Sequence, residues 1–332
     1  MAAYLEQSEA NRIFRTLKQE GVAALFHFTS VDNLPMIRSS GMLCSKARME
    51  RDGNWPCPMP GGDALSHSLD RYNENWDKLS LTFTPNTPMA YWKKRQLHLC
   101  FFVMKPSVAT LRGVIFTDTN ATTTTRPQQR GEGYAGLGVV NFAAIRSTPR
   151  PWDQDGWKSP VQAEILIPDC LPMEFVTEIA FVSNASRAEA ERLWGCSPHP
   201  PFTVNQRYFA DTWNGSHVSL NFPYLRSLSV TDQQVTKENV QQKDWPNLTS
   251  FRSTSPLTAI AKLYAPAGTR AQFVWKPTGR VDATEFDQSA NWSHWSSCSA
   301  VDLSSGPAEI EYWIRDVRWA TLSITIGNRR DA

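Results

Sequence analysis

The strongest constraint on the fold is a change in residue pattern after about residue 210. Beyond it, apolar and polar residues alternate with a period of two, as in "AIAKLYAPAGTRAQFVWK" and "AEIEYWIRDVRWATLSITIG". That period is typical of strands with one buried face. Before it, helix-like and strand-like segments are mixed. We therefore predict an α+β domain over residues 1–225 and a separate, mainly β domain over residues 226–332.

The composition excludes several classes of protein. Of 332 residues, 41% are hydrophobic and 20% charged, which predicts a soluble globular chain. The net charge of +2 is too small to indicate nucleic-acid binding by the whole surface. No apolar run reaches membrane-spanning length, and the charged N-terminus is unlike a secretory signal. The six cysteines form no CxxC pair, so we expect reduced thiols, no metal and a cytoplasmic location.

Several segments have clear local signals. Residues 5–20 have the spacing of an amphipathic helix, and "VAALFHFTS" reads as a strand. The segment "VDNLPMIRSSG" predicts a helix that ends at Gly41, and "SRAEAERLWG" predicts another with Ser186 as its N-cap. Thirteen tryptophans are enough to supply both core positions and stacking surfaces.

The segment "FHFTSVDNL" places His27 and Thr29 at the end of a strand, just before a helix begins. Two interpretations fit this placement. The side chains and the helix N-terminus bind a polar ligand, or His27 is a core histidine and the neighbouring polar groups cap the helix. The pattern alone favours the second interpretation.

A single carboxylate, Glu164, interrupts the apolar strand "VQAEILIP". Such a residue usually faces solvent. With a period of two, however, Gln162 and Glu164 share one face of the strand, and the functional reading is that both line one cleft. The pattern alone favours the solvent-facing reading.

Two further motifs carry an ordinary and a functional reading. In "LTFTPNTPMAYW", Met89 and Tyr91 are core anchors or the apolar wall of a pocket for a flat ring. In "SLDRYNENW", Arg71 is a solvated helix residue or a phosphate ligand. The chain contains no P-loop, GxGxxG, HExxH or GxSxG motif.

Taken together, "FHFTSVDNLPMIRSSGML", "LTFTPNTPMAYW", "VIFTD" and "QAEILIPDCLP" resemble the DarT-type ADP-ribosyltransferase toxins, over residues 22–210. The resemblance implies the ADP-ribosyltransferase fold, in which two small sheets with flanking helices meet around an NAD⁺ cleft. It also implies an enzyme that consumes NAD⁺, without a metal, to modify a base in single-stranded DNA. Residues 226–332 have no counterpart in the minimal members of the family.

The resemblance assigns roles to individual residues. Glu164 corresponds to the catalytic glutamate, and Arg71 to a family arginine, for which Arg48 and Arg51 are alternatives. The residues expected to contact NAD⁺ are His27, Phe28, Thr29, Asn33, Leu34, Gly41, Arg71, Met89 and Tyr91.

On the acceptor side, we expect Gln162 to position the target base, while basic and aromatic residues hold the strand by charge neutralisation and stacking. The named candidates are Lys93, Lys94, Arg146, Arg150, Trp152 and Trp157. A solvated loop with buried tryptophans is the ordinary alternative.

The sequence leaves three alternative hypotheses for the function of the chain. The first is a toxin that ADP-ribosylates a nucleobase, in DNA or in RNA, and is restrained by a macrodomain-type or other antitoxin. The second is a protein-modifying transferase or an NAD⁺ glycohydrolase. In the third, the β-rich segment is a binding module for a partner, an inhibitor or a phage component. A phage-defence setting fits the first.

Overall fold

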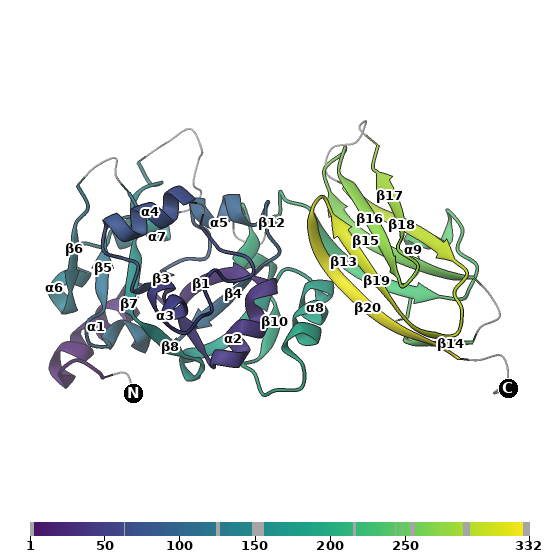
Figure 1. Cartoon of the computed structure of the whole chain (residues 1–332). Coiled ribbons are helices and arrows are strands. Elements are labelled where there is room, and N and C mark those ends of the chain that lie inside the picture. The colour runs from purple at the N-terminus through teal and green to yellow at the C-terminus, as the bar shows by residue number, and fades with distance from the viewer. Residues whose placement is uncertain are drawn as a thin grey trace. The chain divides into compact units, whose positions relative to one another are not determined.

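The computed structural model describes residues 3–62, 64–123, 127–147, 156–214, 217–242, 244–246, 248–252, 256–287 and 293–327. The chain divides into two compact units (Figure 1). The first comprises residues 1–94, 99–181 and 193–220, and the second comprises residues 95–98, 182–192 and 221–332. The second unit thus includes two short segments from the part of the sequence predicted to be catalytic.

The first unit is built on an eight-stranded sheet with the order β10-β9-β4-β1-β3-β7-β5-β6. Its strands are β1 (Leu25–Ser30), β3 (Lys78–Thr82), β4 (Leu99–Met104), β5 (Ile115–Thr117), β6 (Arg130–Glu132), β7 (Glu164–Pro168), β9 (Val176–Phe181) and β10 (Phe202–Val204). The two four-stranded halves are joined only where β1 meets β3, at the single pair Phe26 and Thr82. This arrangement agrees with the predicted pair of small sheets.

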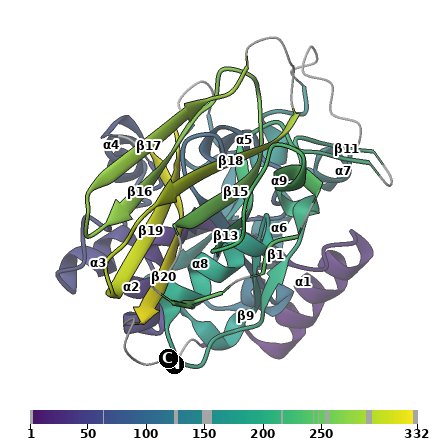
Figure 2. The ribbon, with the colours of Figure 1, turned by 90° about the vertical axis from the view of Figure 1, so that its right-hand side faces the viewer.

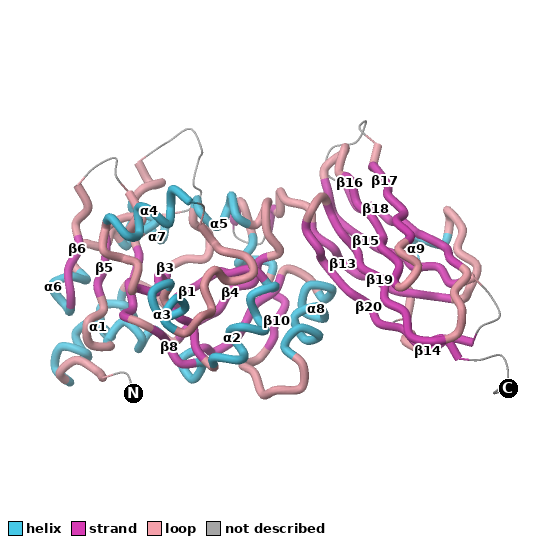
Figure 3. Tube along the Cα trace, viewed as in Figure 1, coloured by secondary structure: helices cyan, strands magenta, loops and turns pink. Residues whose placement is uncertain are grey.

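Helices surround this sheet, and Figure 3 separates them from the strands by colour. They are α1 (Gln7–Gln19), α2 (Leu34–Ser40), α3 (Lys46–Arg51), α4 (Ala64–Tyr72), α5 (Pro88–Lys93), α6 (Gly133–Leu137) and α7 (Phe142–Arg146). Short 3₁₀ turns occur at Val31–Asn33, Pro106–Thr110, Pro160–Gln162, Met173–Phe175 and Gln206–Phe209. Two small ribbons pair β2 (Met42–Cys44) with β8 (Cys170–Pro172), and β11 (Thr212–Asn214) with β12 (His217–Ser219).

The core of this unit lies around β4, whose six residues are all buried because it is covered on both faces. Phe101 and Phe102 are almost inaccessible to solvent, and each contributes roughly 2 kcal/mol of apolar burial. The predicted helix stop at Gly41 is confirmed, since that residue adopts the left-handed conformation with φ of 66°. A rigid central sheet therefore supports the ends of β1 and β3.

The prediction for "VQAEILIP" was wrong in one respect. Residues Pro160–Gln162 form a 3₁₀ turn, and β7 begins only at Glu164. Pro160 occupies the first position of the turn and cannot donate a ladder hydrogen bond, which favours the turn over a longer strand. Period two therefore does not relate Gln162 to Glu164.

The second unit contains two sheets, and Figure 2 labels their strands except β14. One has the order β13-β15-β18, with β13 (Tyr224–Thr231), β15 (Leu257–Ala265) and β18 (Ser293–Val301). The other has the order β14-β20-β19-β16-β17, with β14 (Ser250–Arg252), β16 (Arg270–Lys276), β17 (Arg280–Glu285), β19 (Gly306–Ile314) and β20 (Val317–Gly327). Helices α8 (Asn184–Trp194) and α9 (Asn239–Gln242) complete the helices of the described residues.

Alternating residues of these strands form the core of the second unit. Trp275 and Tyr312 are fully buried. The indole of Trp275 donates to the Ser299 hydroxyl at 2.7 Å, and the Tyr312 hydroxyl lies 3.0 Å from that of Ser297. Because buried polar groups need partners, these serines allow large aromatic rings to fill the interior. The predicted β-rich character of this region is confirmed.

Among the described residues, no helix combines the length and the apolar character that a membrane crossing requires. The same part of the chain contains no cluster of three or more His, Cys, Asp or Glu side chains arranged to hold a metal ion.

Candidate active site

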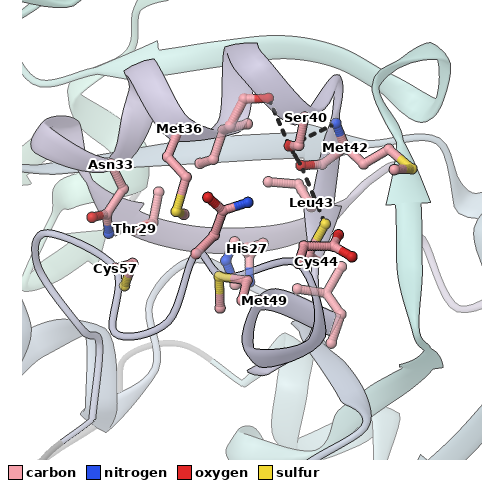
Figure 4. A pocket seen from close by; sticks show the side chains of 14 residues that line it. His27, Thr29, Asn33, Met36, Ser40, Met42, Leu43, Cys44, Met49 and Cys57 are labelled. Carbon is pink, nitrogen blue, oxygen red and sulfur yellow. Dashed lines mark hydrogen bonds between the residues drawn. The ribbon is translucent and has the colours of Figure 1, made fainter. Parts of the chain in front are cut away.

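A cleft of about 230 Å³ opens where β1 and β3 meet. Strand residues, the N-terminal turns of α3 and α5, one face of α4 and the segment around Ala121 all line it. A smaller pocket of about 60 Å³ shares His27, Thr29 and Asn33 with the cleft and continues toward Met36 and Met42 (Figure 4). The sheet junction therefore supplies a deep site with one polar and one sulfur-rich wall.

Glu164 lies in this cleft as the first residue of β7, opposite Thr82 of β3. Its carboxylate accepts a hydrogen bond from the backbone N–H of Ala121 at 2.9 Å, and its own N–H donates to the Thr117 hydroxyl at 3.0 Å. Burial dominates the electrostatics and raises the pKa of Glu164 to about 7, although the Ala121 N–H opposes the rise. The side chain is thus fixed on a strand and titrates near neutrality.

This pKa predicts an effect on stability. Because the pKa of Glu164 in the folded chain, about 7, exceeds its ordinary value of 4.5, ionisation favours the unfolded chain. Stability therefore falls as the pH rises from 4.5 to 7. Glu164→Gln should raise the free energy of unfolding at pH 8 by on the order of 1–3 kcal/mol, with a smaller gain at pH 5. Urea denaturation at both pH values measures this, and an equal effect at both would contradict it.

His27 is held in one tautomer by β3. Its Nδ1 lies 3.0 Å from the carbonyl oxygen of Ser80, which only accepts hydrogen bonds. Burial lowers the pKa of His27 below its ordinary value, so the ring is neutral at pH 7. Nδ1 then carries the hydrogen, and Nε2 is left as an acceptor. His27 lines both the cleft and the smaller pocket, as Figure 4 shows for the latter.

Asn33 supports the cleft by fixing the segment that follows α3. Its side-chain amide donates to the carbonyl of Met59 at 2.8 Å and to the Thr29 hydroxyl at 2.9 Å. Its oxygen accepts from the Met59 N–H at 2.9 Å. Both amide hydrogens are therefore used, which makes Asn33 a positioning residue with one remaining acceptor site.

Two lysines that line the cleft, Lys46 and Lys78, were not among the residues predicted from the sequence. Lys46 lines the cleft, forms an ion pair with Asp70 of α4, and lies 5.4 Å from the centre of the Trp76 ring. The available signal was Ser45, whose hydroxyl accepts from the Arg48 N–H and caps α3. That cap places Lys46 at the first helical position, next to the cleft.

The three arginines considered from sequence lie elsewhere. The Arg71 guanidinium is 3.6 Å from the centre of the Trp76 ring and donates to Glu50 at 2.6 Å. Arg48 pairs with Asp52 and Asp169, and Arg51 pairs with Asp169. None of them lines the cleft.

The other residues predicted to contact NAD⁺ fall into two groups. Phe28, Thr29 and Met89 line the cleft with His27. Leu34 is fully buried, Gly41 caps α2, and Tyr91 packs edge-on against Trp92. These last three residues are absent from the lining of the cleft because their environment is the core, a helix end and a helix surface.

The acceptor-side candidates are also divided. Gln162 lines the cleft, and its amide donates to the Lys158 carbonyl at 2.9 Å. Arg146 is paired with Glu20. Lys94 is buried, pairs with Asp211 at 2.5 Å and donates to the Phe209 carbonyl, so the prediction that it contacts nucleic acid was wrong.

The remaining acceptor-side candidates do not line the cleft or are not described. Lys93 and Trp157 are half-buried outside the cleft lining. Arg150 and Trp152 lie outside the described residues.

A family model described as ssDNA thymidine ADP-ribosyltransferase, DarT, matches residues 26–210. The chain belongs to the DarT family. The matched range covers every element of this DarT cleft, from His27 in β1 to Glu164 in β7. The predicted resemblance is therefore confirmed, together with its α+β architecture.

Relatives of this DarT chain include a DNA ADP-ribosyl transferase–DNA ADP-ribosyl glycohydrolase fusion protein from Thermosipho africanus, which is 25% identical over 191 residues. That alignment covers 54% of this chain and 48% of the relative, so the chain spans about half the length of that relative.

Two solved structures are also similar. Thermus sp. 2.9 DarT in complex with NAD⁺ is 16% identical, with a TM-score of 0.43 over 56% of this chain and 97% of that one. Thermosipho africanus DarTG in complex with ADP-ribose is 20% identical, with a TM-score of 0.46 over 56% of this chain and 51% of that one.

Proposed function

We propose that this protein transfers ADP-ribose from NAD⁺ to a base in single-stranded DNA. The observation that carries the proposal is Glu164, a half-buried carboxylate fixed by Ala121 in the cleft at the sheet junction of a DarT-family chain. Thymine is the base that the family description favours.

The reaction breaks the bond between nicotinamide and ribose, and positive charge develops on the ribose. The Glu164 carboxylate stabilises that charge through the ribose hydroxyl, because it is already oriented by the Ala121 N–H. It also accepts the proton from the attacking base nitrogen. The neutral His27 accepts a hydrogen bond from a ribose hydroxyl at Nε2, since Nδ1 is engaged by Ser80. NAD⁺ is consumed, and no metal takes part.

The rate should depend on pH through Glu164. Both roles require the carboxylate, which dominates only above its pKa of about 7. We expect kcat/KM to rise roughly tenfold for each pH unit below this value and to level off above it. Initial rates between pH 5 and pH 9 measure this. A rate independent of pH from 5 to 8 would contradict the assignment.

The acceptor base must be unstacked to reach the ribose. A set of hydrogen bonds leads outward from Glu164. Ala121, which binds the carboxylate, accepts from the Asn73 and Asn75 side chains at 3.0 Å. The Asn73 carbonyl in turn accepts from exposed Arg130. Tyr72, which directly precedes Asn73 and is the last residue of α4, is 81% exposed. We infer that Tyr72 and Arg130 bind a flanking base and a phosphate.

Tyr72→Ala should therefore weaken binding of a thymine-containing single strand. Stacking contributes roughly 1–3 kcal/mol per base, so we expect about a tenfold increase in Kd with little change in KM for NAD⁺. Fluorescence anisotropy with a labelled oligonucleotide measures the change. The matched control is Phe14→Ala, which removes an aromatic ring that is 48% exposed on α1. Equal losses in both variants would refute the role of Tyr72.

The proposed function is tested by incubating the chain with NAD⁺ and single-stranded oligonucleotides that differ in one base. Mass spectrometry should show an added ADP-ribose on the DNA oligonucleotide that contains thymine. If only RNA oligonucleotides were modified, the acceptor would be RNA and not DNA. Free ADP-ribose alone, or label on protein alone, would replace the proposal with an NAD⁺ glycohydrolase or a protein-modifying transferase.

The biological setting belongs to the same proposal. A base-modifying enzyme damages its own host, so we infer a toxin–antitoxin or phage-defence context in the cytoplasm. The partner is an antitoxin, of the macrodomain type or another type, that neutralises the toxin. In support, the name of the Thermosipho africanus relative joins a transferase to a glycohydrolase in one protein.

The β-rich part is proposed to be an accessory domain. We keep the proposed division into residues 1–225 and 226–332 for function, with recruitment or control of the enzyme as the role of the second part.

A further inference from the structure

The two cysteines Cys44 and Cys170 face each other across the β2–β8 ribbon. The register pairs Met42 with Pro172, Leu43 with Leu171, and Cys44 with Cys170. Directly opposed residues of antiparallel strands project to the same side of the ribbon. Both thiols are free and half-buried, whereas the thiols of Cys196 and Cys298 are exposed.

The neighbouring hydrogen bonds show whether Cys44 and Cys170 form a hydrogen-bonded or a non-hydrogen-bonded pair of the antiparallel ladder. The Ser45 N–H donates to the Asp169 carbonyl at 2.7 Å, and the Met173 N–H donates to the Gly41 carbonyl at 3.2 Å. Hydrogen-bonded pairs alternate along an antiparallel ladder, so Cys44 and Cys170 form a non-hydrogen-bonded pair. Such residues have Cα atoms about 4.5 Å apart. A disulfide spans Cα distances of about 4.4–6.8 Å, so this pair lies at the short, strained end of the range.

The ribbon connects two parts of the cleft. Cys44 lines the cleft and the smaller pocket, where Figure 4 shows its side chain. It is followed by the helix cap Ser45 and by Lys46 in the cleft. Cys170 follows β7, the strand of Glu164, after one turn residue, Asp169, with φ of 59°. A bond between the two sulfurs would therefore constrain the segments that hold Lys46 and Glu164.

We propose that Cys44 and Cys170 are a modification site, at which hydrogen peroxide forms a reversible disulfide that lowers the activity of the adjoining cleft. The thiolate of one cysteine attacks peroxide and breaks its O–O bond, which gives a sulfenic acid and, after protonation, one water. The second thiol displaces hydroxide from the sulfenic sulfur, which forms the S–S bond and a second water. The two sulfurs lose two electrons, which peroxide accepts. A dithiol then reduces the disulfide to the two thiols and is itself oxidised to a disulfide.

The surrounding charges influence how fast this site reacts. Burial raises the pKa of both thiols, and each also experiences Arg48. Asp52 acts on Cys44, while Asp169 and Arg51 act on Cys170. Since only the thiolate attacks peroxide, the oxidation rate should increase about tenfold per pH unit through neutral pH.

The experiment treats the full chain with peroxide, alkylates the remaining thiols, and identifies cross-linked peptides by mass spectrometry. We expect the Cys44–Cys170 disulfide, its loss in Cys170→Ser, and its retention in Cys196→Ser. Both cysteines carrying the alkyl label after treatment, or a disulfide to Cys196 or Cys298 instead, would overturn the proposal. This identification of the disulfide does not depend on any catalytic activity of the chain.

The effect on the cleft rests on the proposed function and is measured separately. Small displacements of catalytic groups cost up to about 100-fold, so we expect oxidation to lower kcat/KM roughly tenfold. A dithiol should restore the rate, and Cys170→Ser, whose side chain does not line the cleft, should keep its basal activity under peroxide. A mapped disulfide without a change in rate, or an equal loss in Cys170→Ser, would refute the link to the cleft.

Discussion

Replacing Glu164 with glutamine should lower the rate of ADP-ribose transfer by roughly 100- to 1000-fold, the usual cost of losing one preorganised electrostatic contact in an active site. Glutamine keeps the size of the side chain and an oxygen for the Ala121 N–H. It lacks the negative charge that stabilises the ribose cation and accepts a proton. Adduct formation measured at pH 8, where Glu164 is ionised, tests this result.

The control is Glu174→Gln, which neutralises an exposed glutamate in the 3₁₀ turn between β8 and β9. It should leave the rate unchanged. NAD⁺ binding by calorimetry should change little in Glu164→Gln, because the substitution removes a contact that strengthens mainly in the transition state. A variant that retains more than about a tenth of the wild-type rate would exclude Glu164 as the catalytic carboxylate.

Replacing Glu189 with alanine should destabilise the second unit by roughly 2–4 kcal/mol. The Glu189 side chain on α8 is only 1% exposed. It accepts two hydrogen bonds from Arg192, at 2.9 and 2.7 Å, and one from the Thr321 N–H of β20 at 2.9 Å. Arg318 lies 3.7 Å away. Removal of the Glu189 carboxylate leaves two arginines and a backbone N–H without their common acceptor.

The chain offers a matched control two residues away. Glu191 lies on the same helix, is 50% exposed, and pairs with Arg187 at 3.4 Å. Glu191→Ala should cost less than about 0.5 kcal/mol, as exposed helical pairs do. Urea unfolding measures the free energy of unfolding of each variant, and hydrogen exchange of the amides in α8 and β20 shows where the loss occurs. Similar losses would show that the buried carboxylate has no special structural role.

Sequence reasoning was strongest where a local rule governs the structure. The periodicity of residues 257–327 follows from strands with one buried face, and the end of α2 at Gly41 follows from its left-handed conformation. The likeness of "HFTSVDNL" and "QAEILIP" to one family identified Glu164 and His27, which the structure brings into one cleft. Periodicity alone did not distinguish a cleft residue from a solvent-facing one.

The remaining features depend on contacts between distant residues. Lys46 enters the cleft because Asp70, Trp76 and the cap Ser45 position it, and none of these pairings has a sequence signature. Ser186, predicted as a helix cap, is instead fully buried inside α8, with its hydroxyl 2.6 Å from His98. Lys94 looked like part of a basic cluster, but Asp211 lies far along the chain and compensates its charge in the interior.

The interleaving of the two units along the chain has a consequence for the order of synthesis. Residues 95–98 and 182–192 leave the ribosome long before β20, yet they belong to the same unit as that strand. His98 stacks on Trp319 at 4.4 Å, and Glu189 binds the N–H of Thr321. The N-terminal two-thirds of the polypeptide therefore carry unfinished packing until the segment around residue 320 has been translated. A ribosome-bound fragment that already contains all of residues 26–210, the part matched by the family model, would therefore still lack the strand on which residues 95–98 and 182–192 pack.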